Sequence, residues 1–417
     1  MMDYLHLKVT HAVADGKSRR VTWLHDEPQA INIEIFYEFD RVMPWSDETM
    51  MDGHVLPILL YAMSIGKTLR VHGPLSHGIM RNIEELQLIW RLWKPTIYKK
   101  IDIIPDRIAD VRRGAGQDKA IAAFSGGVDA TFTALRHTRT LPEKVRYPLS
   151  DVLMVHGFDV AVDNTRDFND LMLRVTPLLD ELHLNLHTIR TNSKTLGLQN
   201  WEDSFALELS GCLHMFSDDF QFGLVGSSEP YNGLVLPWGS SPVTDYLMSG
   251  DKFEIVHDGA GFLRTEKVAE VAKNVIACTT LKVCWEGSVQ SGNCGHCEKC
   301  VRTQLNFLAA GCKIPPCFPP GFDINYINSI NIRNVAQLAE LSAIIRYADL
   351  YGATGHWLPV LKKRVKSWRP LRRHQQLRLL MLSVLVAIGM KEHIKKLRYT
   401  LQNMGRGRKK LPIAAGS

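Results

Sequence analysis

Residues 119–136 read KAIAAFSGGVDATFTALR and combine three local signals. The run 119–124 is short and apolar, which predicts a buried strand. Gly126 and Gly127 follow at once, and glycine lets backbone N–H groups approach an anion closely. Residues 129–136 then predict a helix, whose N-terminal dipole favours negative charge. A strand, a glycine loop and a helix in this order indicate a phosphate-binding loop, although a tight strand–helix turn without a ligand has the same pattern.

The segment that follows repeats this alternation of strands and helices. Further strands are predicted at 152–156, 186–191 and 220–225, and helices at 165–182 and 202–216. Strands that alternate with helices at this spacing predict an α/β fold, in which helices cover both faces of a parallel sheet. Ligands in such sheets bind beyond the carboxyl ends of the strands, which is where the glycine loop would lie.

The regions on either side of this segment also have patterns that predict secondary structure. Before residue 115, the pattern predicts a half-buried strand at 31–36 and helices at 55–65 and 81–93. Four polar residues of this region are expected on the surface: Asp40, Asp47, Asp52 and His54. We divide the chain into an N-terminal α/β accessory domain (1–115), a central α/β domain (116–325) and a helical basic C-terminal region (326–417).

Basic residues are concentrated at the C-terminal end. The segment 360–417 holds 16 of the 50 Lys/Arg residues and one of the 43 Asp/Glu residues. Such a segment can bind phosphates, anionic lipid or an acidic protein, or it can be a solvated helix face. The first residues lack the pattern of a signal peptide, and the longest apolar run, 379–390, is too short to span a bilayer. We therefore expect a cytoplasmic protein without a membrane partner, in which disulfides rarely persist.

Four cysteines have the spacing of a metal site, namely Cys284, Cys294, Cys297 and Cys300. Zinc binds four thiolates tetrahedrally in structural sites, and such a site has no open position for water. We therefore expect Zn²⁺ in a folding role, with an iron–sulfur cluster or free thiols as the alternatives. The other cysteines are expected to be free and buried: Cys212, Cys278, Cys312 and Cys317.

The string SGGVD at 125–129 resembles the PP-loop motif, whose usual form is SGGxD followed by Ser or Thr. That loop binds ATP for cleavage between the α- and β-phosphates, with release of pyrophosphate. Together with the cysteine spacing, it makes residues 118–312 similar to the QueC-like family of 7-cyano-7-deazaguanine synthases. The chain departs from the motif at Ala130, which lacks the usual hydroxyl. The resemblance implies a PP-loop α/β sheet and the cofactors ATP, Mg²⁺ and Zn²⁺.

The resemblance also implies the residues of the site. In this family ATP activates the carboxylate of 7-carboxy-7-deazaguanine as an adenylate, and ammonia converts it to an amide and then to a nitrile. Ser125, Asp129 and Lys267 would be catalytic. The deazaguanine would be bound by Ser228, Glu229, Tyr231 and Asp245. The nucleotide would be bound by Phe124, Ser125, Gly126, Gly127, Val128, Asp129, Ala130, Thr131, His156 and Gly157.

The regions outside 118–312 are not part of an ordinary member of this family. Longer QueC-like proteins resemble components of bacterial antiviral operons, such as Qat and type IV CBASS. The acceptor amine would then belong to a partner protein, whereas an unchanged reaction with ammonia would serve queuosine-type biosynthesis. A PP-loop enzyme that modifies tRNA and a nucleotide-binding scaffold without catalysis are the alternatives. Salt-dependent binding of tRNA would favour the tRNA-modifying enzyme, whereas ATP binding without pyrophosphate release would favour the scaffold. A homodimer is a further possible partner arrangement that the sequence leaves open.

Overall fold

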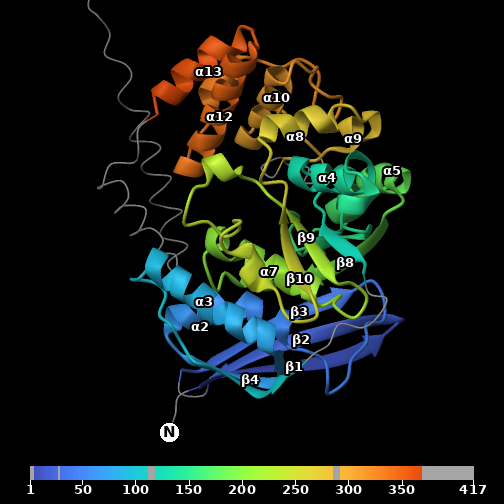
Figure 1. Ribbon diagram of the computed structural model, residues 1–417, viewed down its shortest axis with the longest axis vertical. Helices are drawn as coiled ribbons and strands as arrows, with labels where there is room; N and C mark the ends of the chain where they lie inside the picture. The colour runs from blue at the N-terminus through green and yellow to red at the C-terminus, as the bar shows by residue number, and fades with distance from the viewer. Residues whose placement is uncertain (1–3, 27–28, 111–117, 285–291, 369–417) are drawn as a thin grey trace, which may run out of the picture. The chain divides into compact units, whose positions relative to one another are not determined.

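The computed structural model describes residues 4–26, 29–110, 118–284 and 292–368 (Figure 1). The chain up to Val365 forms one compact unit, and residues 369–417 are outside the described ranges. Most of the predicted basic helical segment therefore lies outside the described residues. Among the helices of the described ranges, none combines the length and the apolar character that a membrane span requires.

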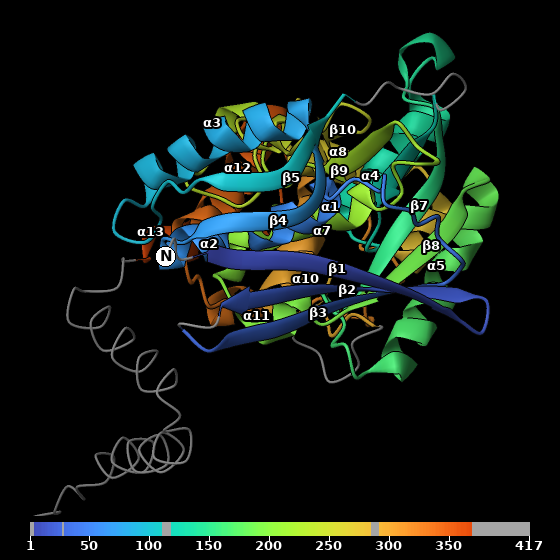
Figure 2. The same ribbon diagram turned by 90° about the horizontal axis from the view of Figure 1, so that it is seen from below.

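Ten strands form one sheet in the order β10-β9-β6-β7-β8-β3-β2-β1-β4-β5 (Figure 2). The five central strands are parallel: β6 (Ala120–Ala123), β7 (Leu149–His156), β8 (Asn185–Thr191), β9 (Phe222–Gly226) and β10 (Glu254–Asp258). Strands β7 and β8 follow on one side of β6, whereas β9 and β10 follow on the other. The strand order thus reverses between β6 and β9, which is where open α/β sheets bind ligands. The predicted α/β fold with a mostly parallel sheet is confirmed.

Strands β6 and β7 are buried on both faces, and their side chains divide between two cores. Ala120 and Ala122 of β6 join one core, whereas Ile121, between them, joins the other. Met154 and Leu153 of β7 divide in the same way. This alternation follows from the period of two in a strand and explains why these segments read as continuous apolar runs.

Helices cover each face of the central strands. Helices α4 (Val128–Leu135) and α5 (Thr165–Leu182) contribute to one core, and α7 (Trp201–His214) contributes to the other. The inward stripe of α5 recurs every three or four residues, at Phe168, Leu171, Val175, Leu178 and Leu182. Burial of each of these side chains stabilises the fold by roughly 1.5–3 kcal/mol.

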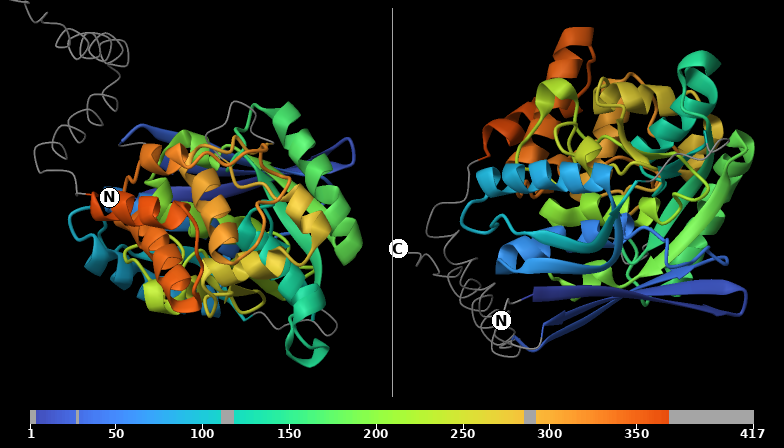
Figure 3. Two further views of the ribbon diagram at one scale, coloured as in Figure 1. Left: turned by 90° about the horizontal axis from the view of Figure 1, so that it is seen from above. Right: turned by 60° about the horizontal axis from the view of Figure 1, so that its bottom comes forward.

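The remaining helices connect and surround this frame. In the views of Figure 3, α12 lies beside α10. Their bounds are α1 (Asp52–Val55), α2 (Leu59–Ile65), α3 (His77–Trp93), α6 (Ser193–Leu196), α8 (Arg264–Val271), α9 (Val275–Thr280), α10 (Glu298–Ala309), α11 (Asn325–Ser329), α12 (Val335–Tyr351) and α13 (Trp357–Lys366).

The N-terminal segment supplies the other half of the sheet. Its strands are β1 (Tyr4–Ala14), β2 (Lys17–Asp26), β3 (Ile31–Phe39), β4 (Thr68–Ser76) and β5 (Ile103–Ala109). Strand β3 pairs antiparallel with β8, so strands on both sides of residue 115 share one sheet. The domain boundaries predicted near 115 and 325 stay predictions.

Two of the polar residues expected on the surface of this segment are buried. Asp52 is 5% exposed and accepts hydrogen bonds from the backbone N–H and the hydroxyl of Ser76. His54 is 1% exposed and bonds Thr22 through Nδ1. The surface prediction is therefore wrong for these two residues, because Ser76 and Thr22, on distant strands, supply hydrogen-bond partners for the Asp52 carboxylate and for Nδ1 of His54.

Candidate nucleotide site and metal centre

The glycine loop after β6 is held by neighbouring strands and by a distant segment. The N–H of Phe124 donates to the carbonyl of Leu153 at 2.9 Å, and the carbonyl of Gly126 accepts from the N–H of Lys282 at 2.7 Å. Gly126 has a φ of +72°, and a Cβ there would lie 3.1 Å from the side chain of Val175. The loop therefore needs glycine at this position, for backbone conformation and for space.

Helix α4 begins directly after this loop, at Val128, with Gly127 as its N-cap. Gly127 caps the helix without a side-chain hydrogen bond. The N–H groups of a first helical turn lack partners within the helix and favour an anion. Ser125 is exposed beside them, with Oγ 3.4 Å from the N–H of Gly127. The loop and the helix N-terminus thus present hydrogen-bond donors that suit the oxygens of a phosphate.

The loop opens into a cavity of about 540 Å³. The cavity lies at the carboxyl ends of β6, β7 and β9, since residues at or just after these ends line it. Several predicted nucleotide and substrate residues also line it, namely Phe124, Ser125, Gly127, Val128, Asp129, Ala130, Ser228 and Glu229. The position agrees with the reversal of strand order, where such sheets bind ligands.

Asp129 on the first turn of α4 is neutralised by two cations of α8. One carboxylate oxygen lies 2.9 Å from Nη1 of Arg264, and the other lies 3.4 Å from Nζ of Lys267. Burial alone would raise the pKa of Asp129, but Arg264 and Lys267 lower it below its usual value. Lys267 is 1% exposed and also donates to the carbonyl of Ser227. Asp129 thus stays ionised without placing a free negative charge at the loop.

A second ion-pair network joins α8 and α10 to α12. Glu340 on α12 pairs with Arg302 and lies 3.9 Å from Arg264. Arg302 also pairs with Glu298 at 2.8 Å. Burial would lower the pKa of Arg302, but Glu340 and Glu298 raise it above its usual value. All four side chains line the cavity, so α12 forms part of its wall.

Three lysines form the cationic side of the cavity, namely Lys194, Lys282 and Lys299. Burial lowers the pKa of Lys194 and of Lys282, and Asp159 partly offsets the effect on both. Burial would raise the pKa of Asp159, but the three lysines lower it. Asp159 makes no hydrogen bond or ion pair with other described residues, so its carboxylate is available to a ligand or cation.

An aromatic row also lines the cavity. Phe158 and Trp201 meet edge to face with ring centroids 4.9 Å apart, and Phe205 continues the row to Trp238 at 6.0 Å. Nζ of Lys194 lies 4.4 Å from the ring centroid of Trp201, a cation–π contact. Aromatic side chains of this kind suit the face of a planar ring.

Glu229 also lines the cavity. Its carboxylate accepts from the N–H of Val235 at 2.9 Å. Burial raises the pKa of Glu229 to about 7, although the Val235 bond opposes the shift. A carboxyl group with such a pKa can give or accept a proton at neutral pH.

Several residues of the predicted site do not line the cavity. His156 is 3% exposed, stacks on Phe168 and bonds the carbonyl of Ala161. Gly157 has no room for a side chain, since a Cβ would lie 2.0 Å from the carbonyl oxygen of Thr191.

The rest of this group is divided between interior and surface. Gly126 and Thr131 are buried and do not line the cavity, and Lys267 lies behind Asp129, with which it pairs. Asp245 is fully buried and accepts from Ser240. Tyr231 is 63% exposed on an adjoining turn.

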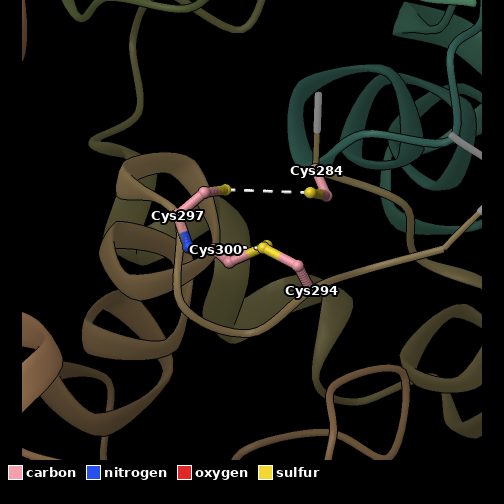
Figure 4. A group of neighbouring side chains, drawn as sticks. All are labelled: Cys284, Cys294, Cys297 and Cys300. Carbon is pink, nitrogen blue, oxygen red and sulfur yellow. Dashed lines mark hydrogen bonds between the residues drawn. The ribbon is translucent and has the colours of Figure 1, made fainter. Parts of the chain in front are cut away.

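The four cysteines of the predicted metal site converge (Figure 4). Their sulfur atoms all lie within 4.8 Å of one another. The Cys284–Cys297 and Cys294–Cys300 pairs have Sγ···Sγ distances of 3.7 and 3.9 Å. A tetrahedron of thiolates around zinc requires about 3.8 Å. The four cysteines could therefore bind a metal such as zinc.

Backbone donors and a side-chain clamp support this arrangement. The N–H of Cys297 points at Sγ of Cys294, 3.3 Å away. Oδ1 of Asn293 accepts from the N–H of Val283 and Cys284, at 2.8 and 3.1 Å. His296 is exposed, and its Nδ1 bonds the carbonyl of Cys294. The other cysteines are free: Cys212 and Cys317 are buried, as expected, whereas Cys278 and Cys312 are only half-buried.

Comparisons of the chain with protein-family models, curated proteins and solved structures returned no match. The functional interpretation therefore depends on the residues and their geometry.

Sequence reasoning missed several residues of the cavity, above all Lys282 and Lys194. Lys282 had a usable signal, because it precedes Cys284 by two residues and is therefore placed by the metal segment. Lys194 and the aromatic row had none, because each follows a strand end by a different loop length.

Proposed function

We propose that the protein uses ATP to adenylate a carboxylate, releases pyrophosphate and transfers the acyl group to an amine. The observation that carries the proposal is the position of the SGGVD loop, at the reversal of strand order and open to a cavity with Lys282 and Lys299. An arrangement of glycine N–H groups, a helix N-terminus and two ammonium groups suits a polyphosphate.

The cavity also has the chemistry for a planar acid. The aromatic row of Phe158, Trp201, Phe205 and Trp238 suits a flat heterocycle, and Ser228 and Glu229 offer polar partners on its edge. A 7-deazaguanine that carries a carboxylate, as in the family that the motif resembles, fits this description. Its carboxylate would then face the loop, where the α-phosphate of ATP would lie.

The first step makes the acid reactive. A carboxylate oxygen of the acid attacks the α-phosphorus of ATP, and the bond to the bridging oxygen breaks, which releases pyrophosphate with the bonding electrons. Lys282 and Lys299 would stabilise the charge that develops on the leaving group. Asp129 would hold Arg264 and Lys267 in place at the loop, as a positioning residue.

The second step forms the product. The lone pair of an amine attacks the acyl carbon, AMP leaves with the bonding electrons, and the nitrogen loses a proton. Glu229, with a pKa near neutral, is placed to accept that proton. Ammonia would give an amide, and a second activation would give a nitrile; a protein amine would give a conjugate instead.

The described carboxylates fit a Mg²⁺ ion beside the phosphates. Mg²⁺ prefers oxygen ligands and binds through one or two carboxylates together with substrate phosphates. Asp159 is the better candidate, because Arg264 and Lys267 already engage both oxygens of Asp129. When bound, Mg²⁺ neutralises phosphate charge.

One observation favours a second candidate, a nucleotide-binding scaffold without catalysis. Ala130 lines the cavity where the related motif has a hydroxyl, so one donor to phosphate is missing. A variant with Ala130→Ser restores that donor. Under the scaffold function, wild type binds ATP but never cleaves it with any acid.

The test is incubation of the full-length protein with ATP, Mg²⁺ and 7-carboxy-7-deazaguanine, with and without ammonia. Pyrophosphate is measured enzymatically, and every small and protein product is weighed by mass spectrometry. We expect pyrophosphate only with the acid, and a product mass that identifies the amine. No pyrophosphate under any of these conditions, despite measured ATP binding, would support the scaffold.

A further inference from the structure

Two of the cavity lysines are carried by the metal-binding segment. Lys282 precedes Cys284 by two residues, and Lys299 lies between Cys297 and Cys300 on the first turn of α10. Both line the cavity, as does Cys284. The spacing along the chain means that the cysteine positions set the backbone positions of both lysines.

The backbone of this segment is hydrogen-bonded to the glycine loop. The N–H of Lys282 bonds the carbonyl of Gly126 at 2.7 Å. On the other side, Nδ2 of Asn293 donates to the carbonyl of Leu281 at 2.9 Å, while its Oδ1 holds Val283 and Cys284. Residues 281–284 are thus held between the loop and the cysteine cluster.

The ammonium group of Lys282 is available to an anion in the cavity. The residue is 3% exposed, and its ammonium group makes no hydrogen bond or ion pair with any other described residue. Asp159 offsets part of the cost of burying this charge but does not pair with it directly, so an anion in the cavity would give the ammonium group a direct partner. Gly126 and Gly127 lack side chains, so the loop backbone approaches Lys282 closely: a Cβ on Gly126 would lie 3.6 Å from Cβ of Lys282, and one on Gly127 would lie 3.7 Å from its carbonyl oxygen.

We infer that the metal centre positions Lys282 and Lys299 as ligands of the nucleotide polyphosphate, so that metal binding and nucleotide binding strengthen each other. The inference rests on the proposed use of ATP and assigns the metal a role beyond folding. Because coupling between two sites is reciprocal, ATP must raise metal affinity by the same factor by which metal raises ATP affinity.

The first test measures ATP affinity by titration calorimetry on zinc-loaded, full-length protein. Loss of one charge-assisted hydrogen bond predicts about tenfold to hundredfold weaker binding for Lys282→Gln. Lys299→Gln should weaken binding in the same direction, and Lys282→Arg should restore most of it. The control is Lys273→Gln, because the Lys273 side chain is 71% exposed and pairs with Glu270 outside the cavity.

The second test measures zinc affinity by competition with a chelator of known affinity, with and without saturating ATP. We expect ATP to raise the zinc affinity of wild type, and Lys282→Gln to lose most of this increase while its zinc affinity without ATP stays unchanged. If Lys282 had only a structural role, its substitution would not change the difference in zinc affinity between protein with ATP and protein without it. Cys294→Ser should lose both zinc and tight ATP binding. If this variant does not fold, the chelator competition on wild type and Lys282→Gln still tests the inference.

Two results would overturn the inference while the proposed function stands. One is ATP binding by Lys282→Gln as tight as by wild type. The other is a zinc affinity of wild type that is the same with and without ATP. If wild type binds no ATP at all, the proposed function fails together with the inference.

Discussion

The backbone N–H of Lys282 donates a hydrogen bond to the carbonyl oxygen of Gly126, with an N···O distance of 2.7 Å. This bond joins the segment that carries the cysteine cluster to the loop that faces the cavity. The two strongest signals of the sequence, more than 150 residues apart, are therefore parts of one site.

Substitution of Gly126 tests how the loop is held. Gly126→Ala places a Cβ at a φ of +72° and 3.1 Å from Val175, a buried core residue. We expect a loss of more than about 2 kcal/mol in the free energy of unfolding, because steric crowding adds to about 1–2 kcal/mol of backbone strain. The control is Gly197→Ala, at a φ of +60° with no atom within 4 Å of the new Cβ. Urea unfolding of both variants measures the difference, and an equal loss of unfolding free energy in Gly126→Ala and Gly197→Ala would contradict the account.

Substitution of Glu340 tests the wall that α12 provides. Glu340→Gln leaves the buried guanidinium of Arg302 with only Glu298, and breaking a buried pair costs about 3 kcal/mol. Asp349→Asn is the control, since the Lys362–Asp349 pair is about half exposed on both sides and such pairs contribute about 0–1 kcal/mol. Urea unfolding of both variants checks the difference. A loss for Glu340→Gln no larger than that of the control would show that the pair is solvent-screened.

The raised pKa of Glu229 predicts a dependence of stability on pH. Its folded pKa of about 7 exceeds the ordinary value of 4.5, so the folded state binds the proton more tightly than the unfolded state. Its contribution is fully present below pH 4.5 and is lost as pH rises through 7. Glu229→Gln removes this loss, because the amide stays neutral and can still accept from Val235.

We therefore expect Glu229→Gln to be more stable than wild type at pH 8 by up to about 3 kcal/mol, and the difference to shrink toward pH 5. Unfolding curves at both pH values measure it. In the variant, the rate of product formation should also no longer change with pH near neutrality, because no carboxyl group titrates at position 229. A stability difference that does not vary with pH would show that Glu229 does not titrate near neutrality.

The cysteine cluster predicts a single closed metal site. Elemental analysis of purified protein should find one zinc per chain, and Cys294→Ser should lose it and melt at a lower temperature. Cys278→Ser is the matched control, because Cys278 lies outside the cluster and should keep the zinc. Iron with broad visible absorbance would instead identify an iron–sulfur cluster.

Local patterns predicted the central fold well. The predicted helix at 165–182 agrees with α5, and each predicted central strand overlaps an observed one, with bounds that differ by up to three residues. These segments were predictable because their period and their glycine and asparagine boundaries are local properties. The cysteine cluster was predictable for the same reason, since three of its four members lie within one short segment.

The sheet as a whole could not be predicted in this way. The pairing of β3 with β8 joins residues about 150 positions apart, and nothing in either strand specifies the other. Site residues that follow strand ends were placed with mixed success, because loop length decides where they point. His156 turns away to stack on Phe168, whereas Lys194, which no motif indicated, enters the cavity.

The most direct test of the central claim is the position at which ATP is cleaved. Full-length wild type, Asp129→Asn and the control Asp47→Asn, an exposed residue away from the cavity, are incubated with ATP, Mg²⁺ and 7-carboxy-7-deazaguanine, and the nucleotides are separated by chromatography. We predict AMP and pyrophosphate in equal amounts, only with the acid, at a rate at least about 100-fold lower in Asp129→Asn and unchanged in Asp47→Asn. ADP and phosphate as products, or a rate that does not need Asp129, would contradict the account.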